Sequence, residues 1–156
     1  MTPDDCMRRA IELADESVRA GRGGPFGAVV VRDGRIVAEG ANEVTATNDP
    51  TAHAEVVAIR NACRALGVFH LTGCEIYASC EPCPMCLGAV YWAHLDRLWF
   101  AAGREDAEAA GFDDGHIYRE LAVAIDARRL PTARLLVEPG RTVLERWRIT
   151  PGKVEY

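Results

Sequence analysis

The side chains best suited to bind a metal or catalyse a reaction are a histidine, a glutamate and two cysteines in two short segments. One residue separates His53 from Glu55, two separate Cys83 from Cys86, and Pro82 directly precedes the first cysteine. Zn²⁺ binds imidazole nitrogen and thiolate sulfur, and a catalytic zinc site has three protein ligands and one open position. His53, Cys83 and Cys86 therefore predict one Zn²⁺ per chain, with two thiolates balancing its charge.

Glu55 is predicted to be the catalytic residue of this site. A zinc ion lowers the pKa of a bound water from about 15.7 to 7, and a nearby carboxylate can then move its proton. Because residues i and i+2 point apart within a regular helix, His53 and Glu55 can face one site only from an irregular first turn. Cys83 and Cys86 are expected in a first turn too, where free N–H groups and the helix dipole favour thiolates.

Cys80 offers an alternative interpretation of the cysteine cluster. Cys80 and Cys83 also have C-x-x-C spacing, so Cys80 as a fourth ligand would make a closed structural zinc site in a non-enzymatic, partner-binding module. We favour the three-ligand site because Cys80 is expected at the end of a strand, ahead of the helix. The other three cysteines, Cys6, Cys63 and Cys74, are expected to pack as small hydrophobic residues.

Helical and strand patterns alternate along the chain and place both motifs at helix starts. Asp49-Pro50 is typical of a helix start, and Asp33-Gly34 of a hairpin turn. Residues 41–49 are expected to form a polar loop. Helices are predicted over about 3–20, 50–66, 82–93, most of 105–127, and 140–148. Strands are predicted over 28–31, 35–40, 75–78, 97–101 and 134–137. The pattern predicts an α/β fold, a three-layer α/β/α arrangement with a mixed five-stranded sheet.

Length and composition favour one globular domain over residues 1–156. The chain is 49% hydrophobic and 26% charged, and its net charge of −5 argues against long nucleic acid or an anionic membrane as partner. The N-terminus is acidic where a signal peptide is basic, and the longest uncharged stretch, 82–95, is too short to span a bilayer. We expect a cytoplasmic protein, in which clustered cysteines bind metal more often than they form disulfides.

Five segments together make the sequence resemble the cytidine-deaminase superfamily, and within it the short bacterial guanine deaminases. The pattern H-x-E…P-C-x-x-C is the signature of zinc-dependent base deaminases. NDPTAHAE and the cysteine motif are shared with tRNA adenosine deaminases, whereas PFGAV, CEPCPMC, YWA, GFDD and the terminal tyrosine favour guanine. Residues 121–150 match no motif. The segments are GGPFGAVVV (23–31), NDPTAHAEVVAIR (48–60), SCEPCPMCLGAVYWA (79–93), AAGFDD (109–114) and EY (155–156).

The resemblance implies a cytidine-deaminase-like fold and hydrolytic deamination of guanine to xanthine and ammonia. It implies His53, Cys83 and Cys86 as metal ligands and Glu55 as the proton shuttle. It further implies a homodimer that exchanges a C-terminal segment, about 130–156, so that the terminal tyrosine completes the partner's pocket. The substrate-binding residues implied are Phe26, Asn42, Trp92, Asp114 and Tyr156, with the backbone N–H of Ala54 orienting the base.

Asp114 distinguishes guanine from the alternative substrates. An ionised carboxylate only accepts hydrogen bonds, and guanine offers N–H groups at N1 and N2. Adenine N1 and cytosine N3 are acceptors, so either base would leave unpaired polar groups costing about 1–3 kcal/mol each. The alternatives that remain are a tRNA adenosine deaminase, for which a net charge of −5 is unfavourable, and a cytosine or aminotriazine deaminase.

Overall fold

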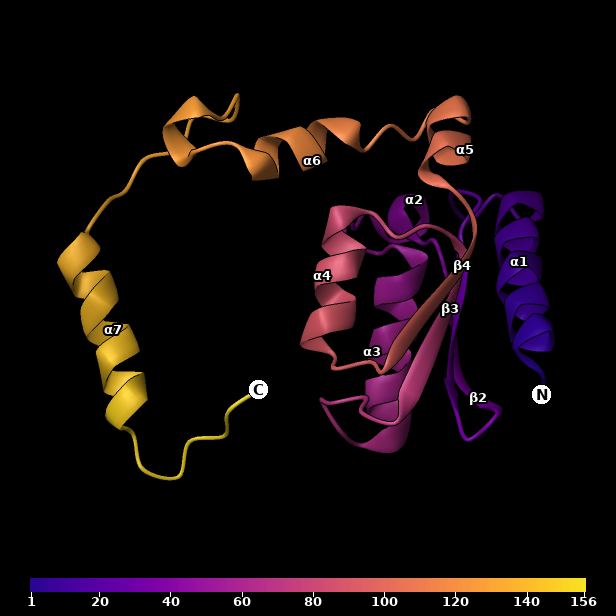
Figure 1. Cartoon of the computed structure of the whole chain (residues 1–156), viewed down its shortest axis with the longest axis horizontal. Helices are drawn as coiled ribbons and strands as arrows, with labels where there is room; N and C mark the ends of the chain where they lie inside the picture. Colours follow the sequence, from indigo (N-terminus) through magenta and orange to yellow (C-terminus); the bar gives the residue numbers. More distant parts are fainter. The chain divides into compact units, whose positions relative to one another are not determined.

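The computed structural model describes all 156 residues and divides into two units, residues 1–114 and 115–156. The single domain expected from the sequence stays a prediction. Figure 1 shows the order of the elements along the chain. The first unit contains helices α1 (Pro3–Arg19), α2 (Val44–Thr47), α3 (Ala54–Leu66), α4 (Pro84–Trp92) and α5 (Arg104–Ala109). The second contains α6 (Gly115–Ala122), the short 3₁₀ helix η1 (Ile125–Ala127) and α7 (Val137–Ile149).

A mixed four-stranded sheet forms the centre of the first unit. Its strands are β1 (Gly27–Arg32), β2 (Arg35–Ala41), β3 (Cys74–Cys80) and β4 (Arg97–Ala102). Their order is β2-β1-β3-β4; β1 is antiparallel to both of its neighbours, and β3 is parallel to β4. The crossover between β3 and β4 contains α4. As an edge strand of this unit, β4 leaves Trp99 and Phe100 36% and 48% exposed.

The predicted fifth strand, residues 134–137, is wrong. Leu136 has a φ of 49°, which is left-handed rather than extended, and Val137 is the first residue of α7. A short apolar run fits either a strand or the start of a helix, and here it leads into the helical pattern that follows. The α/β fold with a mixed sheet is otherwise confirmed.

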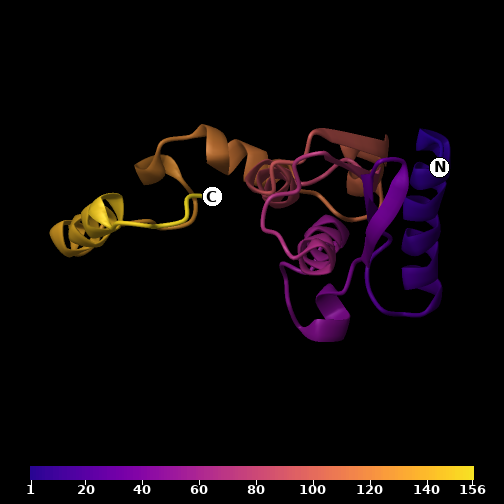
Figure 2. The same ribbon diagram turned by 90° about the horizontal axis from the view of Figure 1, so that it is seen from below.

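Helices cover both faces of the sheet and give it two cores. Along β1, Ala28 and Val30 face the core shared with α3 and α4, whereas Val29 and Val31 face α1. This alternation is the period of two expected of a strand buried on both faces. Figures 1 and 2 show α1 on one side of the sheet and α3 with α4 on the other, which confirms the predicted three layers.

Two glycines bring helix backbones directly against the sheet. A Cβ on Gly40 in β2 would lie 2.4 Å from both the Ala54 carbonyl oxygen and the Ala58 nitrogen of α3. A Cβ on Gly27 in β1 would lie 2.2 Å from the Ala10 carbonyl oxygen of α1. Only glycine permits such an approach. The first turn of α3 is therefore held against the end of β2.

The expected hairpin is confirmed, and the residues after it are more ordered than expected. Asp33 and Gly34 have φ values of 50° and 69°, the paired left-handed conformations of a two-residue turn between strands. Residues 41–49, predicted to be a loop, contain the short helix α2. Asn48 is the C-cap residue of that helix. It has a left-handed conformation (φ 53°), and its backbone N–H donates a hydrogen bond to the Val44 carbonyl.

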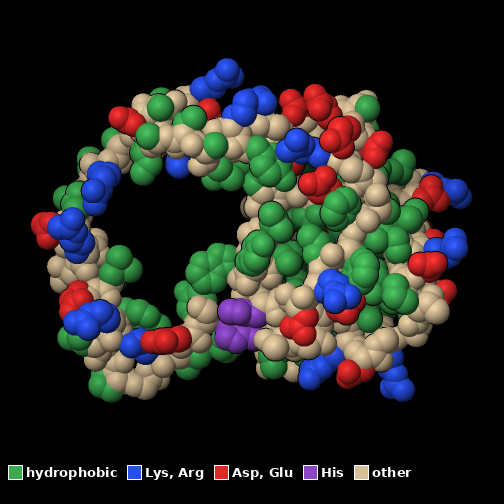
Figure 3. Space-filling model, in the orientation of Figure 1, with side chains coloured by type: hydrophobic (Ala, Val, Ile, Leu, Met, Phe, Trp, Pro, Cys, Tyr) green, Lys and Arg blue, Asp and Glu red, His purple; other side chains and the backbone are tan.

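The second unit has no buried side chain of its own. Helix α7 carries the ion pairs Glu138–Arg141 and Glu145–Arg148, while Leu144 remains 71% exposed. Figure 3 shows apolar side chains interspersed with charged ones along this unit. No helix of either unit combines the length and the apolar composition that crossing a membrane requires.

Replacing Gly40 should test how closely the site depends on this packing. The new methyl of Gly40→Ala meets two backbone atoms of α3, so we expect the free energy of unfolding to fall by about 1–3 kcal/mol. The bound zinc per chain should fall as well, because the first turn of α3 must move. Thermal denaturation and metal analysis measure both. Gly140→Ala, whose Cβ enters open space in α7, is the matched control; equal stability of the two variants would contradict the prediction.

Candidate metal and active site

The turn before α3 sets the position of His53 and Glu55. The Asp49 side chain accepts hydrogen bonds from the Thr51 N–H (2.8 Å) and hydroxyl (2.6 Å), so it caps a separate turn rather than the helix. The helix begins at Ala54, four residues later than predicted, with His53 as its N-cap residue. The late start leaves His53 extended (φ −69°, ψ 155°) and Glu55 in the first turn, which is the irregular arrangement that the motif requires.

The first turn of α4 holds both cysteines. The helix begins at Pro84, not at Pro82 as predicted, and Cys83 is its N-cap residue. Proline is favoured at the first helical position because that N–H has no intrahelical acceptor. Cys86 then lies one turn along, fully buried, and the Leu87 N–H donates to the Cys83 carbonyl at 2.9 Å.

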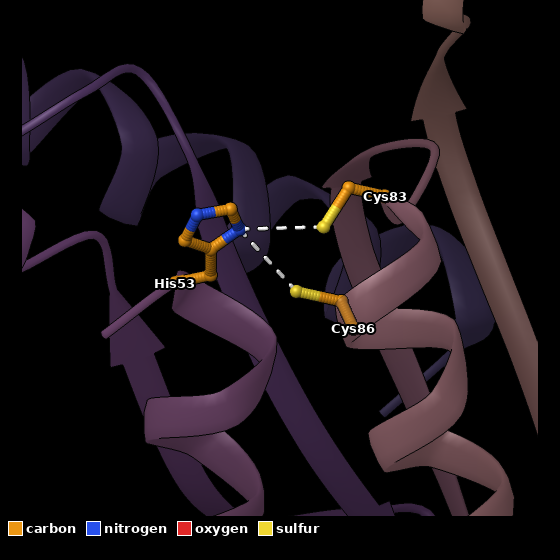
Figure 4. Close-up of side chains that lie close together, drawn as sticks. All are labelled: His53, Cys83 and Cys86. Carbon is orange, nitrogen blue, oxygen red and sulfur yellow. Dashed lines mark hydrogen bonds between the residues drawn. The ribbon is translucent and has the colours of Figure 1, made fainter. Parts of the chain in front are cut away.

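His53, Cys83 and Cys86 converge on one point between the starts of α3 and α4 (Figure 4). The His53 Nδ1 atom lies 3.5 Å from Cys83 Sγ and 3.4 Å from Cys86 Sγ. The three ligand atoms all lie within 4.8 Å of one another. Thiolate and imidazole donors in this number suit Zn²⁺ and leave a fourth position open. The residues therefore fit one zinc ion, and the predicted metal ligands are brought together.

The two thiols form a coupled pair. A hydrogen bond from Cys86 lowers the pKa of Cys83 to about 4, despite the opposing effect of burial. The same bond, together with burial, raises the pKa of Cys86. The hydrogen bond to Cys83 raises the pKa of His53. Before metal binds, the cluster thus contains one thiolate at neutral pH, and a bound cation would favour loss of the second proton.

Glu55 is a buried carboxyl group beside the three ligands. Its side chain is 7% exposed, and burial raises its pKa. The pKa is also influenced by a hydrogen bond with Cys86 and by the charges of Cys83 and His53. A carboxyl group with a raised pKa can both accept and return a proton near neutral pH, which is what an acid–base catalyst must do.

Cys80 lies outside the metal cluster. Its thiol is 3.5 Å from the Gly103 carbonyl oxygen, to which it donates, and burial raises its pKa. The group of side chains able to hold a metal is His53, Cys83 and Cys86. The geometry therefore favours an open three-ligand site over a closed four-ligand one.

Phe26 and Asn42 reach the same end of the sheet. The Phe26 ring packs edge-on against Phe112, with centroids 4.9 Å apart. Asn42 is 6% exposed, and its N–H donates to the Phe26 carbonyl at 3.0 Å. The next N–H, of Glu43, donates to the Ala52 carbonyl at 3.0 Å, directly before the first turn of α3. Hydrogen bonds of the backbone thus connect Phe26 and Asn42 to the residue that precedes His53.

Neither N-cap side chain, His53 of α3 nor Cys83 of α4, makes a capping hydrogen bond. The N–H groups at a helix start attract an anion or a carbonyl oxygen. Ala54, 1% exposed, supplies the first of them in α3. Its predicted role in orienting a substrate is compatible with this position.

Asp114 carries a buried oxygen atom that needs a donor. Its Oδ1 is inaccessible to solvent and has no hydrogen-bond partner. Burial raises the pKa of Asp114, and the charge of Cys83 raises it further, which places this carboxyl group within electrostatic reach of the metal ligands. An unpaired buried carboxylate oxygen is costly unless a ligand donates to it.

Trp92 lies away from the metal ligands along α4. Trp92 is the last residue of α4, at the opposite end of the helix from Cys83, and is 67% exposed. Tyr156 belongs to the second unit and is 74% exposed. Their predicted roles in substrate binding stay predictions.

Phe112 was missed as a candidate pocket residue. It precedes Asp114 by two residues in the GFDD segment, which was noted only as a resemblance. An aromatic residue so close to a predicted recognition carboxylate could have suggested a pocket wall. Ser79 was missed as well; its hydroxyl accepts a hydrogen bond from the Gly27 N–H at 3.0 Å, and no local pattern indicates it.

The fold and the three-ligand site define a zinc-dependent deaminase domain, and comparison with known proteins agrees. Residues 2–102 match the family described as the cytidine and deoxycytidylate deaminase zinc-binding region, and the chain belongs to this family. Over all 156 residues it is 50% identical to the guanine deaminase of Bacillus subtilis, covering 100% of both chains.

A solved structure supports the same relationship. The X-ray structure of Bacillus subtilis guanine deaminase matches with a TM-score of 0.97, covering 100% of this chain and 99% of the other. A tRNA-specific adenosine deaminase of Agrobacterium fabrum is 43% identical over 91 residues, which are 58% of this chain and 59% of that protein. The similarity to guanine deaminase thus extends over the whole chain, whereas the match to the tRNA enzyme covers little more than half of it.

Removal of the metal should expose one unusually reactive cysteine. With its pKa near 4, Cys83 is a thiolate at pH 6, whereas burial raises the pKa values of Cys6, Cys63, Cys74 and Cys80 above the ordinary range. We expect iodoacetamide at pH 6 to label Cys83 of the chelator-treated protein first, and added Zn²⁺ to suppress the labelling. Peptide mass spectrometry locates the label, and Cys83→Ser is the control. Faster labelling of Cys80 would contradict the assignment of the thiolate.

Proposed function

We propose that the protein catalyses the hydrolytic deamination of guanine to xanthine and ammonia. One observation carries the proposal: Asp114 has a buried, unpartnered carboxylate oxygen, and the charge of the metal ligand Cys83 raises the pKa of this carboxyl group. Similarity to a guanine deaminase over the full chain supports it. Because the thiolates of Cys83 and Cys86 must stay reduced to bind metal, we propose that the enzyme acts in the cytoplasm.

Glu55 is proposed to move the protons of the reaction. His53, Cys83 and Cys86 would hold a Zn²⁺ ion, which would make a water molecule at the site more acidic. The Glu55 carboxylate accepts a proton from the water whose oxygen adds to guanine C2, and delivers that proton to N3. Glu55 then carries the proton of the new C2 hydroxyl group to the C2 amino group, the bond between C2 and the amino nitrogen breaks, and ammonia leaves. The C2 carbonyl of xanthine remains, so guanine and water become xanthine and ammonia.

Asp114 is proposed to select the base by accepting hydrogen bonds. The N1–H and N2–H groups of guanine are the donors that its unpaired oxygen lacks. Phe26 and Asn42, together with Phe112, are proposed to bind the ring. Adenine and cytosine would bring acceptors to the same carboxylate, which disfavours them.

A second copy of the chain is proposed to complete the enzyme. The second unit exposes leucines that it cannot bury itself, including Leu130 (73%), Leu135 (82%) and Leu136 (75%). Apolar surface of this extent marks an interface in a stable protein. We propose a homodimer in which residues from about 130 to 156 are exchanged, with Tyr156 closing the partner's pocket.

A panel of bases tests the proposed reaction. We expect ammonia release from guanine to be faster than from adenine, cytosine, aminotriazines or a tRNA stem-loop. Asp114→Ala should lower kcat/KM for guanine by about 100-fold, because two donors of the base lose their partner. Glu55→Gln should abolish turnover of every substrate, and both variants should keep their zinc. Faster turnover of adenine than of guanine by the unmodified enzyme would refute the proposal.

Mixing two inactive chains tests the exchange. One chain carries Glu55→Gln, and the other ends at Glu155 and so lacks Tyr156. If Tyr156 completes the pocket of the partner, each mixed dimer has one complete pocket of two. Random mixing makes about half of the dimers mixed, so about one quarter of the full activity returns. If Tyr156 completes the pocket of its own chain, no dimer contains a complete pocket and the mixture stays inactive. Unchanged activity of the chain ending at Glu155 would exclude Tyr156 from the site.

A further inference from the structure

We propose that Gly23 and Ser17 are positioning residues, which hold Asn42 in a single orientation with its Nδ2 amino group as the atom available to the substrate. The proposal rests on the proposed function, because it assumes that a base occupies the pocket beside the metal ligands. It goes further by identifying how α1 and the glycine-rich loop at 21–27 determine what that pocket can bind.

The other polar groups of Asn42 already have partners. Its N–H donates to the Phe26 carbonyl at 3.0 Å, and its carbonyl accepts from the Ser17 hydroxyl at 3.3 Å. Its side-chain Oδ1 accepts from two backbone N–H groups, those of Gly24 (3.2 Å) and Val44 (3.3 Å). A reversed amide would direct its NH₂ group at two donors, so these bonds fix which end of the amide is oxygen. The Nδ2 group is left for a ligand.

Gly23 is required because the loop lies in direct contact with Asn42. A Cβ on Gly23 would lie 2.2 Å from the Asn42 carbonyl oxygen and 2.7 Å from its Oδ1. The obstacle is space and not backbone conformation, because Gly23 is absent from the residues with positive φ. Any side chain at position 23 must therefore move Asn42 or the loop.

Ser17 connects the same residue to α1. It is completely buried, an unusual environment for a hydroxyl group that would be costly without a hydrogen bond. Its bond to the Asn42 carbonyl holds the end of β2 against the helix. Asn42 is thus fixed from two sides, by Ser17 of α1 and by the backbone of residues 23–24.

The fixed orientation of the Asn42 amide determines which hydrogen-bonding groups a ligand must offer. Asn42 presents a donor and so requires an acceptor on the base, whereas Asp114 presents an unpaired acceptor and requires donors. Guanine meets both requirements, with donors at N1 and N2 and acceptors at O6 and N7. A purine with an amino group in place of O6 offers a donor at that position and loses one of these acceptors.

The resonances of the Asn42 side chain test the positioning without any substrate. The amide proton and nitrogen signals of Asn42 Nδ2 are assigned by their loss in Asn42→Ala. We expect them to shift in Gly23→Ala and in Ser17→Ala. They should not shift in Thr45→Val, which removes a similar hydrogen bond from Thr45 to the Arg22 carbonyl in the same loop without touching Asn42. Unchanged Asn42 signals in both Gly23→Ala and Ser17→Ala would overturn the proposal.

A kinetic cycle then tests whether both residues act through Asn42. With the base that the unmodified enzyme deaminates fastest, Gly23→Ala should raise KM about tenfold and leave kcat and zinc content nearly unchanged. In an Asn42→Ala background the same substitution should change KM less than twofold, because the side chain that Gly23 positions is already absent. If Gly23→Ala does not fold, Ser17→Ala gives the same comparison.

An equal rise in KM in both backgrounds would show a general loss of loop structure and would refute the positioning role. The identity of the fastest base reports separately on the proposed function. A preference for a base other than guanine would refute that function and leave the cycle interpretable.

Discussion

The contact between Gly40 and the first turn of α3 is the constraint on which the site depends. It brings the backbone of β2 to the Ala54 carbonyl, so the histidine and the glutamate of the motif start a helix at a fixed point above the sheet. Helix α4 starts beside it after β3, and its two cysteines complete the ligand set. The N-terminal ends of two helices thus meet, and their dipoles favour the thiolates that the metal requires.

Sequence reasoning succeeded where the chemistry is local. His53, Cys83 and Cys86 could be predicted because ligand types at short spacing identify a zinc site whatever the surrounding fold. The helix that begins at the histidine and glutamate motif was placed four residues too early, because Asp49 caps a turn of its own through Thr51. The role of a capping residue depends on where the chain goes next, which the residue type does not specify.

The contacts that shape the pocket could not be predicted, because they join distant parts of the chain. Ser17 in α1 and Asn42 after β2 are 25 residues apart, and neither has a motif that indicates the other. The glycine-rich loop at 21–27 contains no motif that indicates its close approach to Asn42. The missing fifth strand has a local cause instead, since the short apolar run at 134–137 fits either a strand or a helix start and here leads into α7.

The edge position of β4 has a consequence for how the protein is made. During synthesis, residues 1–114 leave the ribosome first and contain every strand of the sheet. A ribosome-bound intermediate of the first unit already presents this edge strand, with Trp99 and Phe100 on it. Such strands pair readily with those of neighbouring nascent chains. Chains made close together on one messenger are therefore at risk of aggregation through β4.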